Sequence, residues 1–192
     1  MTSPEIHQTI RRAQQGDDAA ITSLYERFAP LIYRYIYYRV SSTADAEDLT
    51  TEVFIKMVEA LPRYKLTGAP FEAWLYRIAF ARVVDFRRRA ERRPLADLSD
   101  EMADSKPNPE EQVSRRLEVE ALRKALRQLT DEQQHILILR FIEQKSHQEV
   151  AEVLGKSMTA VKSAQHRALI QLVAALGSEE KVRHYLRGGG DD

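Results

Sequence analysis

Apolar residues recur every three or four positions along most of the chain, which is the spacing of helices that bury one face. In the first half this pattern predicts helices over 5–15, 19–40, about 45–61 and 71–93. The breaks between them contain glycine, proline or clustered serine and threonine, which end helices. The predicted core positions of the second helix are Ile21, Leu24, Phe28, Leu31, Ile32, Tyr35 and Ile36.

The helical period returns at 111–176, after a stretch at 94–110 that holds three prolines and many acids and has no period. We expect this stretch to be a flexible acidic linker. Thr130 and Ser146 each begin a capping-box sequence, T-D-E-Q and S-H-Q-E, which predicts a helix start at both places. The chain is therefore predicted to be all-α, with two small helical domains and a tail at 177–192.

The fourth helix is unusual because both of its faces carry large side chains. A solvated face should not hold tyrosine and phenylalanine among arginines. A face that lies against nucleic acid would, since arginines neutralise phosphates and aromatic rings stack on unpaired bases. The alternative interpretation is a helix buried between two partners, with a basic end. The apolar arc consists of Phe71, Trp74, Leu75, Ile78, Ala79 and Phe86, and the opposite arc of Tyr76, Arg77, Phe80, Val84, Arg87 and Arg88.

A helix-turn-helix is predicted after Ser146. The short helix SHQEVAEVL is followed by Gly155, which can take the left-handed conformation at a turn, and Ser157 then caps a longer helix. A short helix, a glycine turn and a helix with a polar and basic outer face are typical of proteins that place the second helix in the DNA major groove. The alternative is an ordinary helical hairpin with a solvated face. The outer face consists of Thr159, Lys162, Ser163, His166, Arg167 and Ile170.

Charge is segregated along the chain although its net value is zero. Residues 81–94 hold six arginines against two acids, and residues 95–120 hold eight acids against three basic residues. Basic residues dominate again over 156–187. Two basic patches joined by an acidic strap suit a protein that touches DNA at two places.

Several classes of protein are disfavoured by what the sequence lacks. With no cysteine there is no disulfide or cysteine–zinc site, and the five histidines show no metal-ligand spacing. We find no phosphate-binding glycine loop and no nucleophile–base pair, so we expect no cofactor, no metal and no enzyme. No window is apolar enough for a membrane span and the N-terminus has no signal-peptide core, so we expect a cytoplasmic protein without membrane insertion.

Three stretches resemble the group IV, or extracytoplasmic function (ECF), sigma factors of bacterial RNA polymerase. The first stretch, 45–61, resembles the helix that docks on the clamp coiled coil of the polymerase β′ subunit; its sequence is DAEDLTTEVFIKMVEAL. The second, 71–89, resembles the helix that melts and reads the −10 element; its sequence is FEAWLYRIAFARVVDFRRR. The third, 129–169, resembles the −35 reading domain; its sequence is LTDEQQHILILRFIEQKSHQEVAEVLGKSMTAVKSAQHRAL. By this resemblance, residues 5–93 are sigma region 2 and residues 111–176 are sigma region 4.

The resemblance implies which residues meet each partner. The implied contacts to core RNA polymerase at the β′ clamp coiled coil are Asp48, Glu52, Phe54 and Ile55, and the β flap is implied as a further polymerase contact. The implied −10 contacts are Tyr64, Lys65, Tyr76, Arg77, Phe80, Arg87 and Arg88. The implied −35 contacts are Lys156, Thr159, Lys162, Ser163, His166 and Arg167. The chain departs from the family after Phe80, where members commonly have asparagine soon after the Ile-Ala pair and Ala81 follows here.

The function that the resemblance implies is a promoter-specificity subunit that binds core polymerase, recognises promoter DNA and starts transcription. An anti-sigma factor is implied as a further partner. Two alternatives remain open at this point. One is a sigma mimic that titrates an anti-sigma factor, and the other is a free-standing helix-turn-helix transcription regulator, which would leave the aromatic and basic helix at 71–93 unexplained.

Overall fold

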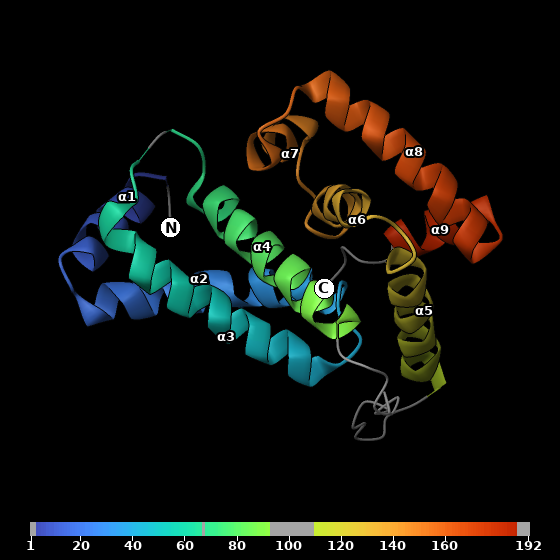
Figure 1. The fold of residues 1–192 in the computed structure, drawn as a ribbon, viewed down its shortest axis with the longest axis horizontal. Coiled ribbons are helices and arrows are strands. Elements are labelled where there is room, and N and C mark those ends of the chain that lie inside the picture. The colour runs from blue at the N-terminus through green and yellow to red at the C-terminus, as the bar shows by residue number, and fades with distance from the viewer. Residues whose placement is uncertain (1–2, 67, 93–109, 188–192) are drawn as a thin grey trace.

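Helices make up all the regular structure in the described part of the chain, which is residues 3–66, 68–92 and 110–187 of a computed structural model (Figure 1). This confirms the prediction of an all-α protein. The predicted linker at 94–110 lies outside the described residues except for Glu110. The N-terminal bundle consists of α1 (Ser3–Gln14), α2 (Asp18–Tyr37), α3 (Thr43–Ala60), a 3₁₀ turn (Leu61–Arg63) and α4 (Phe71–Glu91). The C-terminal bundle consists of α5 (Glu110–Leu126), α6 (Asp131–Leu137), a π-helical turn (Ile138–Ile142), α7 (His147–Leu154), α8 (Met158–Leu176) and α9 (Glu179–Arg187).

Polar side chains fix where most of these helices begin. Asp17 accepts a hydrogen bond from the Ala20 amide and so caps α2. The capping boxes predicted at Thr130 and Ser146 are both formed: each hydroxyl accepts a hydrogen bond from the backbone amide three residues on, and the backbone amide of Thr130 or Ser146 donates one to the side chain of that residue. Ser157 caps α8 as Asp17 caps α2, by accepting a hydrogen bond from one backbone amide without a reciprocal bond. The short-range sequence signals therefore decide the helix boundaries here.

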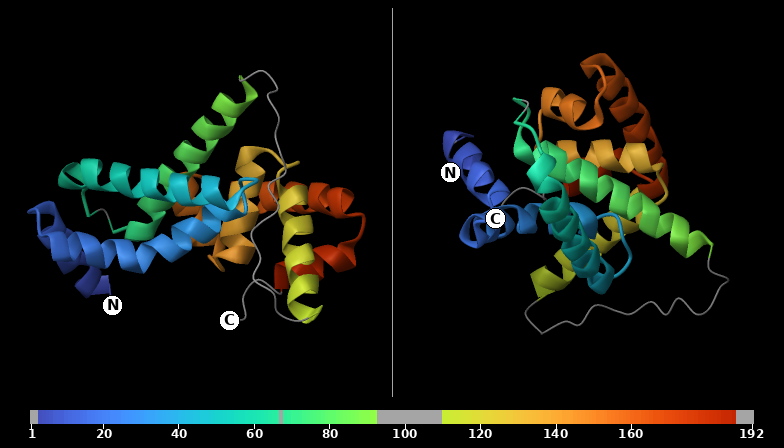
Figure 2. Two further views of the ribbon diagram at one scale, coloured as in Figure 1. Left: turned by 90° about the horizontal axis from the view of Figure 1, so that it is seen from below. Right: turned by 60° about the vertical axis from the view of Figure 1, so that its left-hand side comes forward.

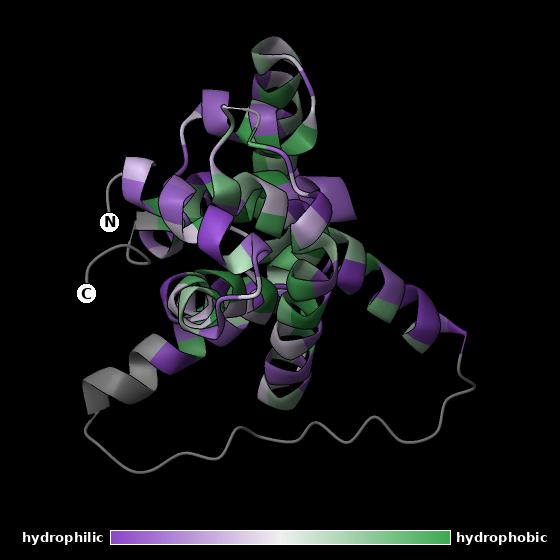
Figure 3. Cartoon of the chain, turned by 90° about the vertical axis from the view of Figure 1, so that its left-hand side faces the viewer, coloured by the Kyte–Doolittle hydropathy of each residue, from purple (hydrophilic) through white to green (hydrophobic). Residues whose placement is uncertain are grey.

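The buried side chains of both bundles form one continuous cluster. The predicted core of α2 is confirmed at Leu24, Phe28, Ile32 and Ile36, which are at most 3% exposed. Green, hydrophobic segments gather toward the middle of the molecule in Figure 3, and purple, hydrophilic segments lie mostly toward its periphery. Burial of apolar surface therefore holds the two bundles against each other as well as holding each together.

Helix α4 lies on the side of the N-terminal bundle that meets the C-terminal bundle. It packs against α2 and α3 on one side and against α7 on the other (Figures 1 and 2). Tyr76, which the sequence placed on the arc opposite the apolar one, is 0% exposed, and the buried stripe also includes Ala73 and Val83. The helix is therefore covered on two sides, which is the alternative interpretation that the sequence left open.

The turn of the helix-turn-helix depends on Gly155. This residue ends α7 with φ of +64°, a left-handed conformation that strains any residue with a Cβ atom. A Cβ added there would meet no atom within 4 Å, so backbone strain is the only cost of substitution. We expect Gly155→Ala to lower the free energy of unfolding by about 1 kcal/mol, measured by chemical denaturation. An unchanged denaturation midpoint would contradict this account of the turn.

Candidate nucleic-acid interface

The outer face of α8 is open along its whole length. Val161, Ala164, Ala168 and Leu172 point inward and are buried, as predicted, which turns the polar arc to solvent. The predicted contacts Thr159, Lys162, Ser163, His166 and Arg167 are all exposed. Lys156, at the start of the turn, is exposed and pairs with Glu132 at 2.6 Å. Lysine and arginine on such a face can reach phosphates or guanine edges, and serine and histidine can do either.

The loop before α4 carries a lysine beside an aromatic cluster. Lys65 is exposed. The Tyr64 ring is half-buried against Trp74 and Phe71, with ring centroids 4.6 and 5.2 Å apart respectively. Burial raises the pKa of the Tyr64 hydroxyl, which therefore stays protonated at neutral pH. Part of this ring therefore supports α4 through Phe71 and Trp74.

The aromatic residues on the outer arc of α4 are engaged by the C-terminal bundle. The Tyr76 hydroxyl donates a hydrogen bond to Glu143 Oε2 at 3.0 Å. The Phe80 ring meets the His135 ring edge-on, with centroids 4.7 Å apart, and lies under the Arg39 guanidinium. In this state neither aromatic ring is available for stacking on a base.

Some arginines of α4 contact the C-terminal bundle and others do not. Arg77 donates hydrogen bonds to the backbone carbonyls of Val153 and Glu152 near the end of α7. Arg87 Nη1 lies 2.7 Å from Asp131 Oδ1. Arg88, one residue further, is exposed. Of the seven −10 residues implied by the resemblance, only Lys65 and Arg88 combine exposure with freedom from contacts to the C-terminal bundle among the interactions described here.

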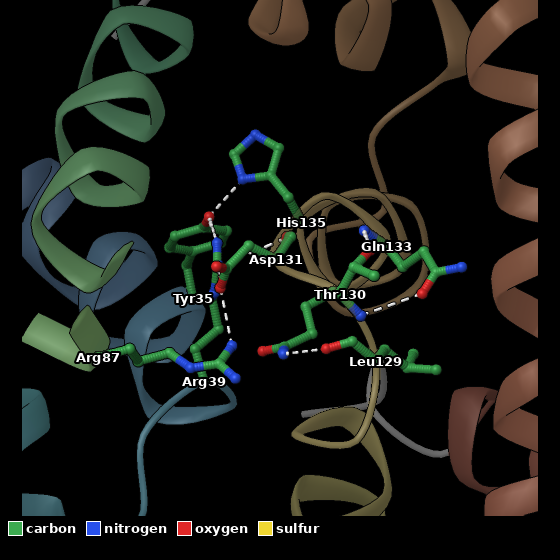
Figure 4. Close-up of polar contacts among 9 residues, drawn as sticks. Tyr35, Arg39, Arg87, Leu129, Thr130, Asp131, Gln133 and His135 are labelled. Atoms are coloured by element: carbon green, nitrogen blue, oxygen red, sulfur yellow. Dashed lines mark hydrogen bonds and ion pairs between the residues drawn. The ribbon is translucent and has the colours of Figure 1, made fainter. Parts of the chain in front are cut away.

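A buried polar cluster between the bundles was not foreseen from the sequence (Figure 4). Tyr35 and Arg39 extend from the end of α2 and meet α6, where the Tyr35 hydroxyl contacts His135 Nδ1 and Arg39 Nη2 lies 3.0 Å from Asp131 Oδ1. Burial raises the pKa of Tyr35 to about 12. Burial, and to a lesser extent the nearby Arg39 charge, hold the pKa of His135 well below its usual range, so this histidine is neutral. The capping box at Thr130 predicts where α6 begins. No local signal in the sequence indicates that Asp131 and His135, in the first turns of this helix, contact the other bundle.

The third candidate surface lies on α3. Asp48 is exposed, Glu52 is partly exposed and Ile55 is 52% exposed. Phe54 is 5% exposed and packs edge-on under Tyr25, with ring centroids 4.9 Å apart. A partner would therefore meet Ile55 and the Tyr25 ring, with Phe54 supporting them from below. Acids around an exposed apolar centre suit a basic partner surface.

No group of three histidine, aspartate or glutamate residues within the described ranges is placed to hold a metal ion. Among the helices of the described segments, none combines the length and the apolar character needed to cross a membrane.

Comparison with known proteins gives the same two-part division. The family model "Sigma-70 region 2" matches residues 24–93, and the model "Sigma-70, region 4" matches residues 119–172. The chain is 39% identical to the ECF RNA polymerase sigma factor ShbA of Streptomyces griseus over 86% of this chain and 92% of that protein. It is 36% identical to the ECF RNA polymerase sigma factor BldN of Streptomyces coelicolor over 93% of this chain and 69% of that one.

A solved structure shares the fold. The sigma factor RpoE of Bartonella quintana, solved in complex with the anti-sigma factor NepR, superimposes with a TM-score of 0.63 at 18% sequence identity. The match covers 82% of this chain and 97% of that one.

Proposed function

The chain belongs to the ECF RNA polymerase sigma factors, and from this membership we propose that it is the promoter-specificity subunit of a bacterial RNA polymerase. Members of this family are transcription initiation factors and not enzymes, so the polymerase carries out the chemistry. The work of this chain is to bind core polymerase, to recognise two promoter elements and to hold the strands apart at one of them. We place it in the cytoplasm, where core polymerase works.

The observation that carries the proposal is the pairing of two different DNA-reading surfaces in one chain. The exposed polar arc of α8 suits a duplex major groove. The aromatic and arginine residues of α4 suit single-stranded DNA, because base stacking and phosphate neutralisation need no duplex. A free-standing helix-turn-helix regulator has use for the first surface only. A sigma factor needs both, since it reads the −35 element as a duplex and the −10 element as a melted strand.

Each site residue has a role in this proposal. On α8, Lys162 and Arg167 bind the −35 duplex, with Lys156, Thr159, Ser163 and His166 beside them. On α4 and the preceding loop, Arg77, Arg87, Arg88 and Lys65 neutralise phosphates of the −10 strand, while Tyr64, Tyr76 and Phe80 stack on its bases. On α3, Asp48, Glu52 and Ile55 dock on the β′ clamp coiled coil, and the C-terminal bundle meets the β flap.

An anti-sigma factor is the further partner that we propose. The support is the RpoE–NepR complex, whose sigma factor shares this fold. A protein that bound α3 would compete directly with core polymerase, and a protein that bound α8 would compete with DNA. Both surfaces are open in this structure.

Binding to core polymerase is the deciding test. We expect the purified chain to co-elute with core RNA polymerase in size exclusion at moderate salt. The double variant Asp48→Lys and Glu52→Lys should lose co-elution, because it replaces two acids on the docking surface by bases.

The matched control is Glu179→Lys with Glu180→Lys, which makes the same change in charge on α9, in the other bundle. This control should co-elute as the unmodified chain does. If the unmodified chain fails to bind while its circular dichroism spectrum stays helical, the proposal is wrong, and a sigma mimic or a free-standing regulator becomes the better account.

A further inference from the structure

The loop that leads into α4 is held at its start by Gln14, the last residue of α1, which the sequence pattern did not single out. The side-chain nitrogen Nε2 of Gln14 donates hydrogen bonds to two backbone carbonyl oxygens, that of Leu61 at 3.0 Å and that of Tyr64 at 2.7 Å. These partners lie 47 and 50 positions further along the chain. One side chain of α1 thus fixes the backbone on which Tyr64 and Lys65 stand.

The end of α1 gives Gln14 a fixed position. Ile10 and Ala13, which are 0% and 5% exposed, belong to the hydrophobic core and bury one face of α1. Arg12 pairs with Asp17 at 2.6 Å, and Asp17 in turn caps α2. A side chain on a helix that is held in this way positions its partners more precisely than a side chain on a free loop.

The two carbonyl groups bracket the 3₁₀ turn between α3 and the loop. The Leu61 carbonyl accepts a hydrogen bond from the Tyr64 amide at 3.0 Å in addition to the one from Gln14. The Tyr64 carbonyl follows the turn, in extended backbone, and accepts a hydrogen bond from the same Gln14 nitrogen. A carboxamide has two N–H donors, so one glutamine can serve both carbonyls. Gln14 therefore ties down both ends of this turn.

The Tyr64 ring is held from the other side by α4, through the contacts with Trp74 and Phe71 described above. Its backbone and its ring are thus fixed by different helices. Lys65 follows directly and is exposed. The charge of this lysine and the part of the Tyr64 ring that is not buried are therefore presented from a backbone that is ordered before any ligand binds.

We propose that Gln14 is a positioning residue for promoter reading, which holds Tyr64 and Lys65 where an unpaired base and its phosphate are received. This inference rests on the proposed function, which supplies the single strand. Gln14 acts through the loop and makes no contact with DNA. A loop that is ordered in advance loses less conformational entropy on binding and admits fewer orientations of the base.

The expected consequence is a loss of selectivity rather than a uniform loss of affinity. Contacts with phosphates carry no sequence information and tolerate a displaced loop, whereas contacts with a base depend on its exact placement. A chain without the Gln14 hydrogen bonds should therefore still bind single strands but should distinguish their bases less well. A residue that served stability alone would weaken both properties together.

Three variants separate the two roles. Gln14→Met has a side chain of similar length that cannot donate a hydrogen bond, and it is the test variant. Gln14→Lys restores a donor of similar reach and serves as the rescue. Gln15→Met makes the same replacement at the next residue, whose side chain is exposed, and it is the control.

The first measurement uses the free chain and its single tryptophan, Trp74. Because Trp74 is partly buried against the Tyr64 ring, release of the loop would expose its indole to solvent. Gln14→Met should raise the acrylamide quenching constant of the tryptophan emission by about twofold, as expected for local opening. Gln14→Lys and Gln15→Met should keep the value of the unmodified chain.

The second measurement uses the complex of the chain with core polymerase. The probe is a pool of synthetic DNA single strands that carry a short randomised segment, and the strands that bind are sequenced. Selectivity is the ratio of the most to the least favoured base at the most selective position. Gln14→Met should lower this ratio by about tenfold while the total DNA bound changes by less than about twofold. Gln14→Lys should restore the ratio, and Gln15→Met should leave it unchanged.

The inference is overturned by a Gln14→Met complex that keeps the base ratio of the unmodified complex. It is also overturned if the ratio falls while the quenching constant stays the same, because the loop would then not have moved, or if Gln14→Lys fails to restore the ratio. An equal fall in total binding and in selectivity would assign Gln14 to stability alone. Failure of the unmodified chain to bind core polymerase contradicts the proposed function and this inference with it, while the quenching constants still show whether Gln14 holds the loop.

Discussion

Acidification from about pH 7.5 to about pH 5 is expected to shift the free chain from the closed state, in which the two bundles are packed together, to an open state in which they separate. His135 is buried between the bundles with a pKa well below its usual range, and in the open state water would reach it and restore a pKa near 6.5. The closed state therefore binds fewer protons than the open state below pH 6.5. Its advantage is complete above that pH and falls by up to tenfold per pH unit below it. With a pKa of about 6.5 in the open state, the closed-to-open ratio at pH 5 should drop by at most about 30-fold, or about 2 kcal/mol.

The groups around His135 also indicate that protonation of its imidazole destabilises the closed state. The Arg39 guanidinium and the Tyr35 hydroxyl face it from α2, and the Phe80 ring faces it from α4. Asp131 lies one turn earlier on the same helix, but its carboxylate already pairs with Arg39 and Arg87. A proton on the imidazole would thus lie beside one cation with no free anion to offset it.

The test uses spin labels on cysteines introduced at the exposed positions Glu26 on α2 and Gln171 on α8, in a sequence that has no cysteine of its own. Pulsed dipolar spectroscopy would measure the distance between the labels against pH, and His135→Gln is the control. Glutamine can still bind the Tyr35 hydroxyl but does not titrate, so the variant should keep one distance across the range. The control also separates His135 from His147 on α7, whose pKa is lowered as well, first by desolvation and then by the nearby Arg140. A pH-dependent distance that persists in the His135→Gln variant would show that another group is responsible.

Leu24→Ala is expected to cause the largest loss of stability. Leu24 is 0% exposed at the centre of the N-terminal core, and truncating a buried leucine costs both transfer free energy and a cavity. We expect the free energy of unfolding to fall by about 2–5 kcal/mol, measured by chemical denaturation followed by circular dichroism. The chain supplies a matched control in Leu117 on α5, which is 67% exposed. Leu117→Ala should change stability by about 0.5 kcal/mol or less, and equal losses in the two variants would contradict this packing.

The helices and the face of α8 could be predicted from the sequence because their signals are local. A capping box such as that of Thr130 or Ser146 acts within four residues, and the inward stripe of α8 packs within its own bundle. The same reasoning found the aromatic and basic arc of α4 and left open whether nucleic acid or a second partner covers it. These signals carry no information about distant segments.

The cover of α4 could not be predicted for that reason. The helical periodicity indicates that Tyr76 and Phe80 lie on a covered face of α4. The residues that they contact, Glu143 and His135, lie 67 and 55 positions further along the chain. Asp131 and Glu143 look like ordinary surface acids in the sequence, and their role appears only when the bundles are seen together. Polar contacts between domains leave no periodic pattern, because single charges at scattered positions suffice to make them.

The outer face of α8 stays exposed while most of the outer arc of α4 is covered by the C-terminal bundle. A chain whose α8 binds duplex DNA as proposed would rest on double-stranded DNA, leave it and move to another place without disturbing the base pairs. The search for a promoter and the separation of its strands would thereby be kept apart in time.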